Sequence, residues 1–131
     1  MNFHARAIAV AGIVLTSGAA VGQAAEPMTC NTELGRQVFT LCSACHALDA
    51  GEAPREGPVL RGVFERKVAG DPAFRYSEAL RASNWSWDAA TLDRFLANPR
   101  RALPGTIMTF IGLKSAEERA AVVCYLREAA R

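Results

Sequence analysis

The chain has 131 residues, of which 50% are hydrophobic, and its 15 basic and 13 acidic side chains give a formal net charge of +2. This length and composition fit one globular domain and exclude a disordered protein and a multidomain enzyme. Because the charge is small and forms no block, the sequence also argues against nucleic acid as a partner.

The first 25 residues have the organisation of a secretory signal peptide. A short basic start with Arg6 precedes an apolar run over residues 7–15, and small residues then lead to Ala24 and Ala25. The alternative is an uncleaved anchor, but the apolar run is shorter than the roughly 20 residues that a membrane-spanning helix needs. We therefore predict that residues 1–25 are cleaved near Ala24 or Ala25.

Cleavage would leave a domain over residues 26–131 that is exported to the periplasm without stable membrane insertion. It would remove Arg6, so the formal charge falls to about +1. It would also remove His4, which makes His46 the sole histidine of the exported chain. Any metal site in this domain therefore has one imidazole available.

A helix is predicted from Thr32 to about Cys45, where apolar side chains recur at spacings of three and four. From Ala47 to Phe74 this periodicity is lost, and frequent glycine and proline predict a long irregular segment. Such a segment is unusual in a compact domain unless a bound group orders it.

Three later stretches predict helices. The first is "YSEALRAS", with Ser77 as candidate cap, and the second is "SWDAATLDRFLANP", which Ser86 can cap and Pro99 should end. The third starts at a capping box of Ser115 and Glu118 and runs to the C-terminus. No stretch alternates as a strand would, so we predict an all-α domain of about four helices.

The sequence Cys42-Ser-Ala-Cys45-His46 has three chemical interpretations. A redox dithiol needs its cysteines at a strand-to-helix junction, whereas this pair lies late in a predicted helix. A structural zinc site needs four ligands, but Cys30 and Cys124 are far apart in the sequence. Attachment of haem c explains each residue, because two thiols bind the porphyrin and the adjacent imidazole binds the iron. A haem would also fill the small core that about 106 residues can build.

The second axial ligand decides what the iron can do. The exported chain offers Met28, Met108, Lys67, Lys114, the terminal amine or an open position. Met28 lies in a polar lead-in, whereas Met108 lies in the apolar segment "LPGTIMTFIG" between two predicted helices, where a gap-filling core methionine is the alternative. We favour Met108, because a thioether opposite histidine is typical of electron-carrying haems. Iron with both positions filled exchanges electrons and does not bind oxygen or peroxide.

Seven short stretches carry a resemblance to a known family, namely "GRQVF", "CSACH", "GPVLRGVFERK", "FRYSEAL", "WSWDAATLDRFLANPRR", "LPGTIMTFIGL" and "VVCYL", which together span roughly residues 34–126. Their order resembles that of the class I cytochromes c. The chain resembles the mitochondrial cytochromes c and the bacterial cytochromes c2, and the separation of His46 and Met108 fits the axial pair of that family. The resemblance implies helices wrapped around one covalent haem c, with the first and last helices crossing.

The resemblance implies further roles at matching positions. Pro58 resembles the proline whose carbonyl accepts a hydrogen bond from the proximal imidazole. Arg66, Tyr76 and Trp87 stand where the family places its partners for the haem propionates.

Other matching positions concern the methionine side and the helix crossing. Thr106 stands where a hydroxyl supports the methionine side, and Phe110 stands where an aromatic ring screens the haem edge. Gly35, Phe39 and Tyr125 resemble the contact set at which the first and last helices cross.

Three positions depart from the family pattern. Phe95 replaces a usual tyrosine and Leu80 a common asparagine, which predicts a drier pocket and a reduction potential no lower than is typical for the family. Glu65 replaces the glycine expected before Arg66, so the family pattern does not predict the conformation of the turn at this position.

The remaining cysteines are Cys30, just before the first helix, and Cys124, on the last helix near the expected crossing. In an exported protein we predict a disulfide between them, the alternative being two separate small buried residues.

The function implied is that of a monomeric, soluble one-electron carrier, not an enzyme, that acts between larger redox complexes. With few lysines, and with Arg100, Arg101 and Ile107 expected near the haem edge, docking should be weakly charged or apolar. Two alternatives remain open. One is a haem enzyme or ligand-responsive protein in which Met108 dissociates, and the other is the haem subunit of a dehydrogenase.

Overall fold

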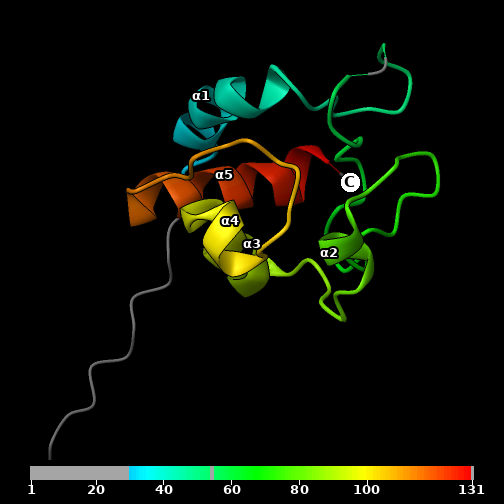
Figure 1. Cartoon of the computed structure of the whole chain (residues 1–131). Coiled ribbons are helices and arrows are strands. Elements are labelled where there is room, and N and C mark those ends of the chain that lie inside the picture. The colour runs from blue at the N-terminus through cyan, green and yellow to red at the C-terminus, as the bar shows by residue number, and fades with distance from the viewer. Residues whose placement is uncertain (1–29, 54, 131) are drawn as a thin grey trace, which may run out of the picture.

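The computed structural model describes residues 30–53 and 55–130. These residues form five helices in chain order (Figure 1), which are α1 (Thr32–Ser43), α2 (Glu78–Arg81), α3 (Ala89–Ala97), α4 (Pro99–Ala102) and α5 (Ala116–Ala129). These described residues form no strand, and their one isolated bridge joins Lys67 to Ser86. The predicted all-α class is confirmed, and the predicted irregular segment has no helix between α1 and α2.

Two predictions fall on residues that the structure does not describe. The signal peptide, residues 1–25, and Met28 both lie outside the described residues. Within the described part of the chain, none of the helices combines the length and the apolar character that crossing a bilayer would require.

The helix starts are explained by polar side chains. Asn31, Ser77 and Ser115 each accept a hydrogen bond from the backbone N–H three residues later, at the starts of α1, α2 and α5. Each such cap stabilises a helix by about 1 kcal/mol. Ser77 and Ser115 are the caps predicted from the sequence, although the structure shows only the serine half of the predicted capping box at Ser115.

The prediction for α3 named the wrong cap and missed the short helix that follows. Its cap is Asp88 and not Ser86, because Ser86 is held in the bridge before the helix. The Asp88 carboxylate accepts a hydrogen bond from the Thr91 N–H at 2.7 Å, and the Thr91 hydroxyl accepts one from the Asp88 N–H at 2.8 Å. Pro99 ends α3 as predicted but also begins α4, a helix that was not predicted, since proline suits the first helical position and Asn98 caps it.

The first and last helices, α1 and α5, pack against each other (Figure 1). A Cβ atom on Gly35 would overlap the carbonyl oxygen of Ala121 and lie 2.6 Å from the Cβ of Tyr125. The rings of Phe39 and Tyr125 have centroids 5.3 Å apart. Gly35, Phe39 and Tyr125 therefore make the contact that the resemblance implied, and glycine allows the close approach.

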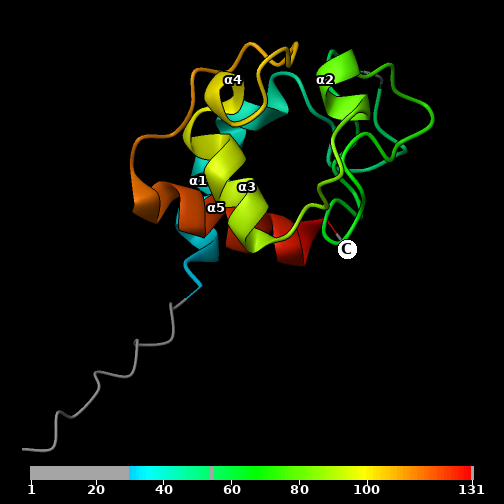
Figure 2. The same ribbon diagram turned by 60° about the horizontal axis from the view of Figure 1, so that its bottom comes forward.

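The helices and loops of the described residues lie on two sides of a central region. Figure 2 shows α1, α3, α4 and α5 on one side, and α2 with the irregular segment of residues 47–76 on the other. Within this segment Glu65 has φ 63° and Ala69 has φ 59°. These are left-handed conformations that cost a non-glycine residue roughly 1–2 kcal/mol. Glu65 thus forms a left-handed turn that glycine would form without this cost.

Candidate functional site

A cavity of about 310 Å³ lies between the two sides of the fold. Its lining is mostly apolar and comes from all of the helices except α4, and from the segments that connect them. The structure brings all ten residues predicted for haem binding to this cavity, namely Cys42, Cys45, His46, Pro58, Arg66, Tyr76, Trp87, Thr106, Met108 and Phe110.

The two cysteines lie where α1 ends. The N–H groups of Cys45 and His46 both donate to the carbonyl of Cys42, at 3.0 and 2.9 Å, so the turn continues past Ser43 and presents three reactive side chains to the cavity. Both thiols are half-buried and free of disulfides. Burial, with a smaller effect of Cys45, raises the pKa of Cys42 to about 11. A thiol that stays protonated is a slow partner in disulfide exchange, which argues against the dithiol interpretation.

His46 is oriented by its neighbours. Its Nδ1 lies 2.8 Å from the carbonyl oxygen of Pro58, and because a carbonyl only accepts, Nδ1 carries the proton and leaves the Nε2 lone pair available. Burial lowers the pKa of His46, and the Pro58 hydrogen bond partly offsets this, so the imidazole is neutral near pH 7. A neutral imidazole with a free Nε2 is a common metal ligand.

Gly57 packs directly against the His46 ring and was missed by the sequence analysis. A Cβ on Gly57 would lie 2.5 to 2.8 Å from three ring atoms of His46. The N–H of Gly57 also donates to the carbonyl of Cys45 at 2.7 Å. A glycine immediately before Pro58 was the available signal, but its role depends on a contact across eleven residues of irregular chain.

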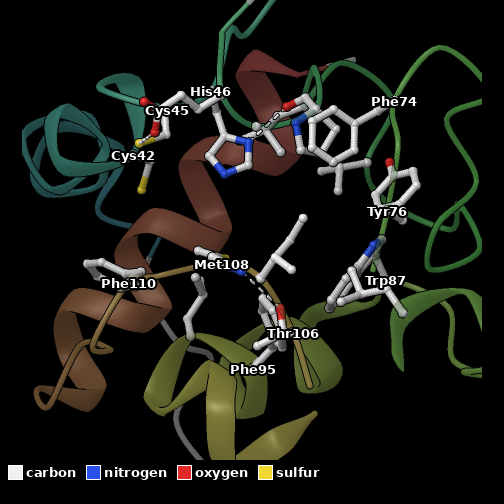
Figure 3. A pocket seen from close by; sticks show the side chains of 18 of the residues that line it. Cys42, Cys45, His46, Phe74, Tyr76, Trp87, Phe95, Thr106, Met108 and Phe110 are labelled. Atoms are coloured by element: carbon white, nitrogen blue, oxygen red, sulfur yellow. Dashed lines mark hydrogen bonds between the residues drawn. The ribbon is translucent and has the colours of Figure 1, made fainter. Parts of the chain in front are cut away.

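Met108 lies on the other side of the cavity. Figure 3 shows His46 on one side and the segment carrying Thr106, Met108 and Phe110 opposite it. The Met108 N–H donates to the Thr106 hydroxyl at 3.3 Å, and both side chains are half-buried. The cavity thus has an imidazole on one side and a thioether-bearing segment on the other.

Arg66 has an unusual environment. Two of its nitrogens donate to the carbonyls of Arg61 and Val59, at 3.1 and 3.0 Å, but its buried Nε has no partner. A buried N–H of a cationic group without an acceptor is costly, so an anionic group is expected beside it. Tyr76 and Trp87, both buried, line the same cavity (Figure 3). Burial raises the pKa of Tyr76, which therefore keeps its hydroxyl hydrogen as a donor.

Apolar side chains form the wall near the Met108 segment. Leu80 and Phe95 are both buried and line the cavity, and the Phe95 ring lies 5.1 Å from the Trp87 ring, centroid to centroid. At these two positions the pocket has no polar side chain, as the sequence predicted. The consequence for the reduction potential stays a prediction.

The second cysteine pair lies outside the cavity. Cys30 is exposed, Cys124 is buried on α5, and their Cα atoms are 5.8 Å apart, within the range that a disulfide requires. The structure therefore brings together the pair that the sequence analysis selected.

The residues of the cavity fit a haem c. Two free thiols can form thioether bonds, a neutral imidazole and a thioether can bind iron, and the apolar lining can take a porphyrin. The unpaired Nε of Arg66 offers a donor to a carboxylate.

Comparison with known proteins agrees with this fit. The cytochrome c family model matches residues 32–130. Cytochrome c2 of Rhodomicrobium vannielii is 40% identical over 119 residues, which are 91% of this chain and 91% of that protein. Cytochrome c2 iso-2 of Magnetospirillum molischianum is 42% identical over 89 residues, which are 68% of this chain and 91% of that protein.

A solved structure gives the same result. Cytochrome cH from Methylobacterium extorquens aligns with a TM-score of 0.69 at 34% identity, covering 74% of this chain and 97% of that one. The chain therefore belongs to the cytochrome c family, has the all-α class I fold, and is an electron carrier with covalently attached haem c, not an enzyme.

Proposed function

We propose that this chain is a periplasmic one-electron carrier whose haem c is attached through Cys42 and Cys45 and whose iron is bound by His46 and Met108. When bound, haem c supplies an iron that gains and loses one electron. The observation that carries the proposal is the hydrogen bond from His46 Nδ1 to Pro58, which leaves Nε2 free on the side of the cavity that faces the Met108 segment.

The residues around the two ligands have distinct tasks. Pro58 fixes the tautomer and the orientation of His46 and raises its basicity. Thr106 holds the backbone of Met108. Phe110, half-buried at the cavity, screens it from solvent. If His46 and Met108 both held the iron, no position would be left for oxygen or peroxide, and the haem would supply electron exchange alone.

The propionates are proposed to lie against Arg66, Tyr76 and Trp87. The support is the buried Arg66 Nε without a partner, together with the raised pKa of Tyr76, which keeps a hydroxyl donor at the same cavity. Two carboxylates would bring the net charge of the exported chain to about −1.

Export rests on the sequence of residues 1–25, with residues 26–131 as the mature domain. The periplasm is an oxidising compartment, and a disulfide between Cys30 and Cys124 agrees with it.

Docking to redox complexes is proposed to use the exposed apolar rim of the cavity. Leu41 and Ile107 line the cavity, yet 58% and 63% of their surfaces are exposed. Ile111, in the Met108 segment, is 82% exposed. A monomeric carrier docking through these residues should react with its partners at rates that change little with added salt. A steep fall in rate with salt would contradict this docking mode.

The axial ligand can be tested with a matched pair of variants, because the exported chain has two methionines. Met108→Ala should abolish the methionine-to-iron charge-transfer band of the ferric holoprotein and bind cyanide rapidly. Met28→Ala should behave like the parent protein in both measurements.

Other outcomes would overturn the proposal. A five-coordinate ferric signal in the parent protein would favour a ligand-binding haem protein. Loss of the band in Met28→Ala would reassign the sixth ligand. Stable co-purification with a large partner would favour a dehydrogenase subunit.

A further inference from the structure

The segment that carries Met108 forms its hydrogen bonds at its two ends, while Met108 and Phe110 also pack against the core. It has no helix or strand between α4 and α5. Near Met108 the hydrogen bond to Thr106 fixes the chain, and at the far end the Leu113 N–H donates to the carbonyl of Leu96 on α3 at 2.8 Å. Between these points, the backbone of residues 109–112 forms no hydrogen bond with any described residue. The far end therefore limits how far Met108 can move.

Arg119 on α5 binds this far end. Its Nη1 donates to the carbonyls of Leu113 and Lys114, at 2.9 and 3.0 Å. The Arg119 side chain is only 14% exposed, and its bond to the Leu113 carbonyl is partly buried, whereas its bond to the Lys114 carbonyl is exposed. One guanidinium thus ties the end of the Met108 segment to the start of α5.

Asp93 on α3 binds a different nitrogen of the same guanidinium. Its carboxylate accepts from the Arg119 Nε at 2.7 Å, across 26 positions of sequence. Without Asp93, Arg119 keeps its charge and its two carbonyl acceptors but loses the acceptor of its Nε, so one of the contacts that orient the guanidinium plane is removed. Asp93, Arg119 and the two carbonyls form one connected group that joins α3, α5 and the Met108 segment.

We propose that Asp93 is a positioning residue for the thioether ligand and that it acts through Arg119. It touches neither the cavity nor Met108, and it sets how readily the Met108 segment moves away from the site. This inference rests on the proposed function, since it requires Met108 to be the ligand.

The test compares two carboxylates in the ferric holoprotein. Asp93→Ala removes the carboxylate that accepts from the Arg119 Nε. Glu33→Ala is the control, because Glu33 pairs with Arg36 at the same distance of 2.7 Å on the exposed face of α1. Cyanide binding, which requires Met108 to leave, should be about fivefold faster in Asp93→Ala and unchanged in Glu33→Ala. Asp93→Glu, which restores the carboxylate, should recover most of the slow rate.

A second measurement separates positioning from general destabilisation. Arg119→Lys keeps the charge but replaces the planar guanidinium, whose Nε binds the carboxylate and whose Nη1 binds the carbonyls, with a single nitrogen that does not match this geometry. Adding Asp93→Ala to Arg119→Lys should accelerate cyanide binding by less than twofold, because the connection is already broken. The denaturant midpoint of the whole domain should fall only slightly in Asp93→Ala and Glu33→Ala, so that faster cyanide binding is the effect specific to Asp93→Ala.

The failures of the two proposals are distinguishable. If the parent protein lacks the methionine band, the proposed ligation fails. If the band is present but Asp93→Ala binds cyanide no faster than Glu33→Ala, only the positioning role fails. Multiplicative effects of Asp93→Ala and Arg119→Lys would also overturn it.

Discussion

The surroundings of His46 and those of Met108, here called the His46 side and the Met108 side of the cavity, are built differently. On the His46 side, α1 packs on α5, Gly57 and Pro58 contact the imidazole, and Arg55 donates to the carbonyls of Ser43 and His46. On the Met108 side, an extended segment is held by a few hydrogen bonds at its ends. Both sides contact the core, but the His46 side also has hydrogen bonds around the imidazole, whereas the Met108 segment has hydrogen bonds only near its ends.

This difference matters for the proposed function. Changes on the His46 side should alter the free energy of unfolding, because they disturb packing that all of the fold shares. Changes on the Met108 side should alter access of small ligands to the iron and leave global stability nearly unchanged. Three sets of variants test whether the two sides differ in this way.

The largest effect is expected from the cysteine pair at the end of the α1–α5 contact. Replacing Cys30 and Cys124 together with alanine should lower the free energy of unfolding by up to about 4 kcal/mol. The bond would close a sequence separation of 94 positions, although attached haem already restrains the unfolded chain. Denaturant unfolding of the holoprotein measures the loss, and the methionine band should persist. Two reactive thiols in the denatured, unreduced parent protein would contradict the disulfide.

A smaller effect is expected from Gly57→Ala. The new methyl group would meet the His46 ring at 2.5 to 2.8 Å, and such overpacking costs about 2 to 3 kcal/mol. Gly51→Ala is the matched control, because a Cβ there has nothing within 4 Å. Unfolding midpoints of the two holoproteins measure the difference. Equal midpoints would show that the His46 side is not tightly packed.

Sequence patterns predicted best what depends on neighbouring residues. The starts of α2 and α5 followed from Ser77 and Ser115, each of which binds a backbone N–H three residues away. The motif around His46 and the choice of Met108 came from the residues themselves, and the resemblance added six more residues, all of which line the cavity because the family motifs keep their order in the chain. It did not foresee α4, where Asn98 and Pro99 provide local signals that we interpreted only as the end of α3.

Other features depend on distant residues and could not be predicted. The choice between Ser86 and Asp88 as the cap of α3 is decided by the bridge between Ser86 and Lys67. The left-handed turn at Glu65 is imposed by the folded segment, with the Glu65 N–H bonded to the Trp87 carbonyl at 2.7 Å. Such contacts appear only once segments far apart in the sequence are packed together.

The smallest effect on stability, and the sharpest test of the Met108 side, is expected from Thr106→Val. This change keeps the shape of the side chain but removes the acceptor of the Met108 N–H, a loss of about 1 kcal/mol. If that loss falls on the ligand-bound segment alone, cyanide should bind the ferric holoprotein roughly fivefold faster while the unfolding midpoint stays nearly constant. Thr106→Ser keeps the hydroxyl and should bind cyanide at the parent rate. Thr109→Val removes an exposed hydroxyl from the same segment and should also leave the rate unchanged. Equal rates in Thr106→Val and Thr109→Val would mean that the segment is held by its packing, and the contrast between the two sides would then be wrong.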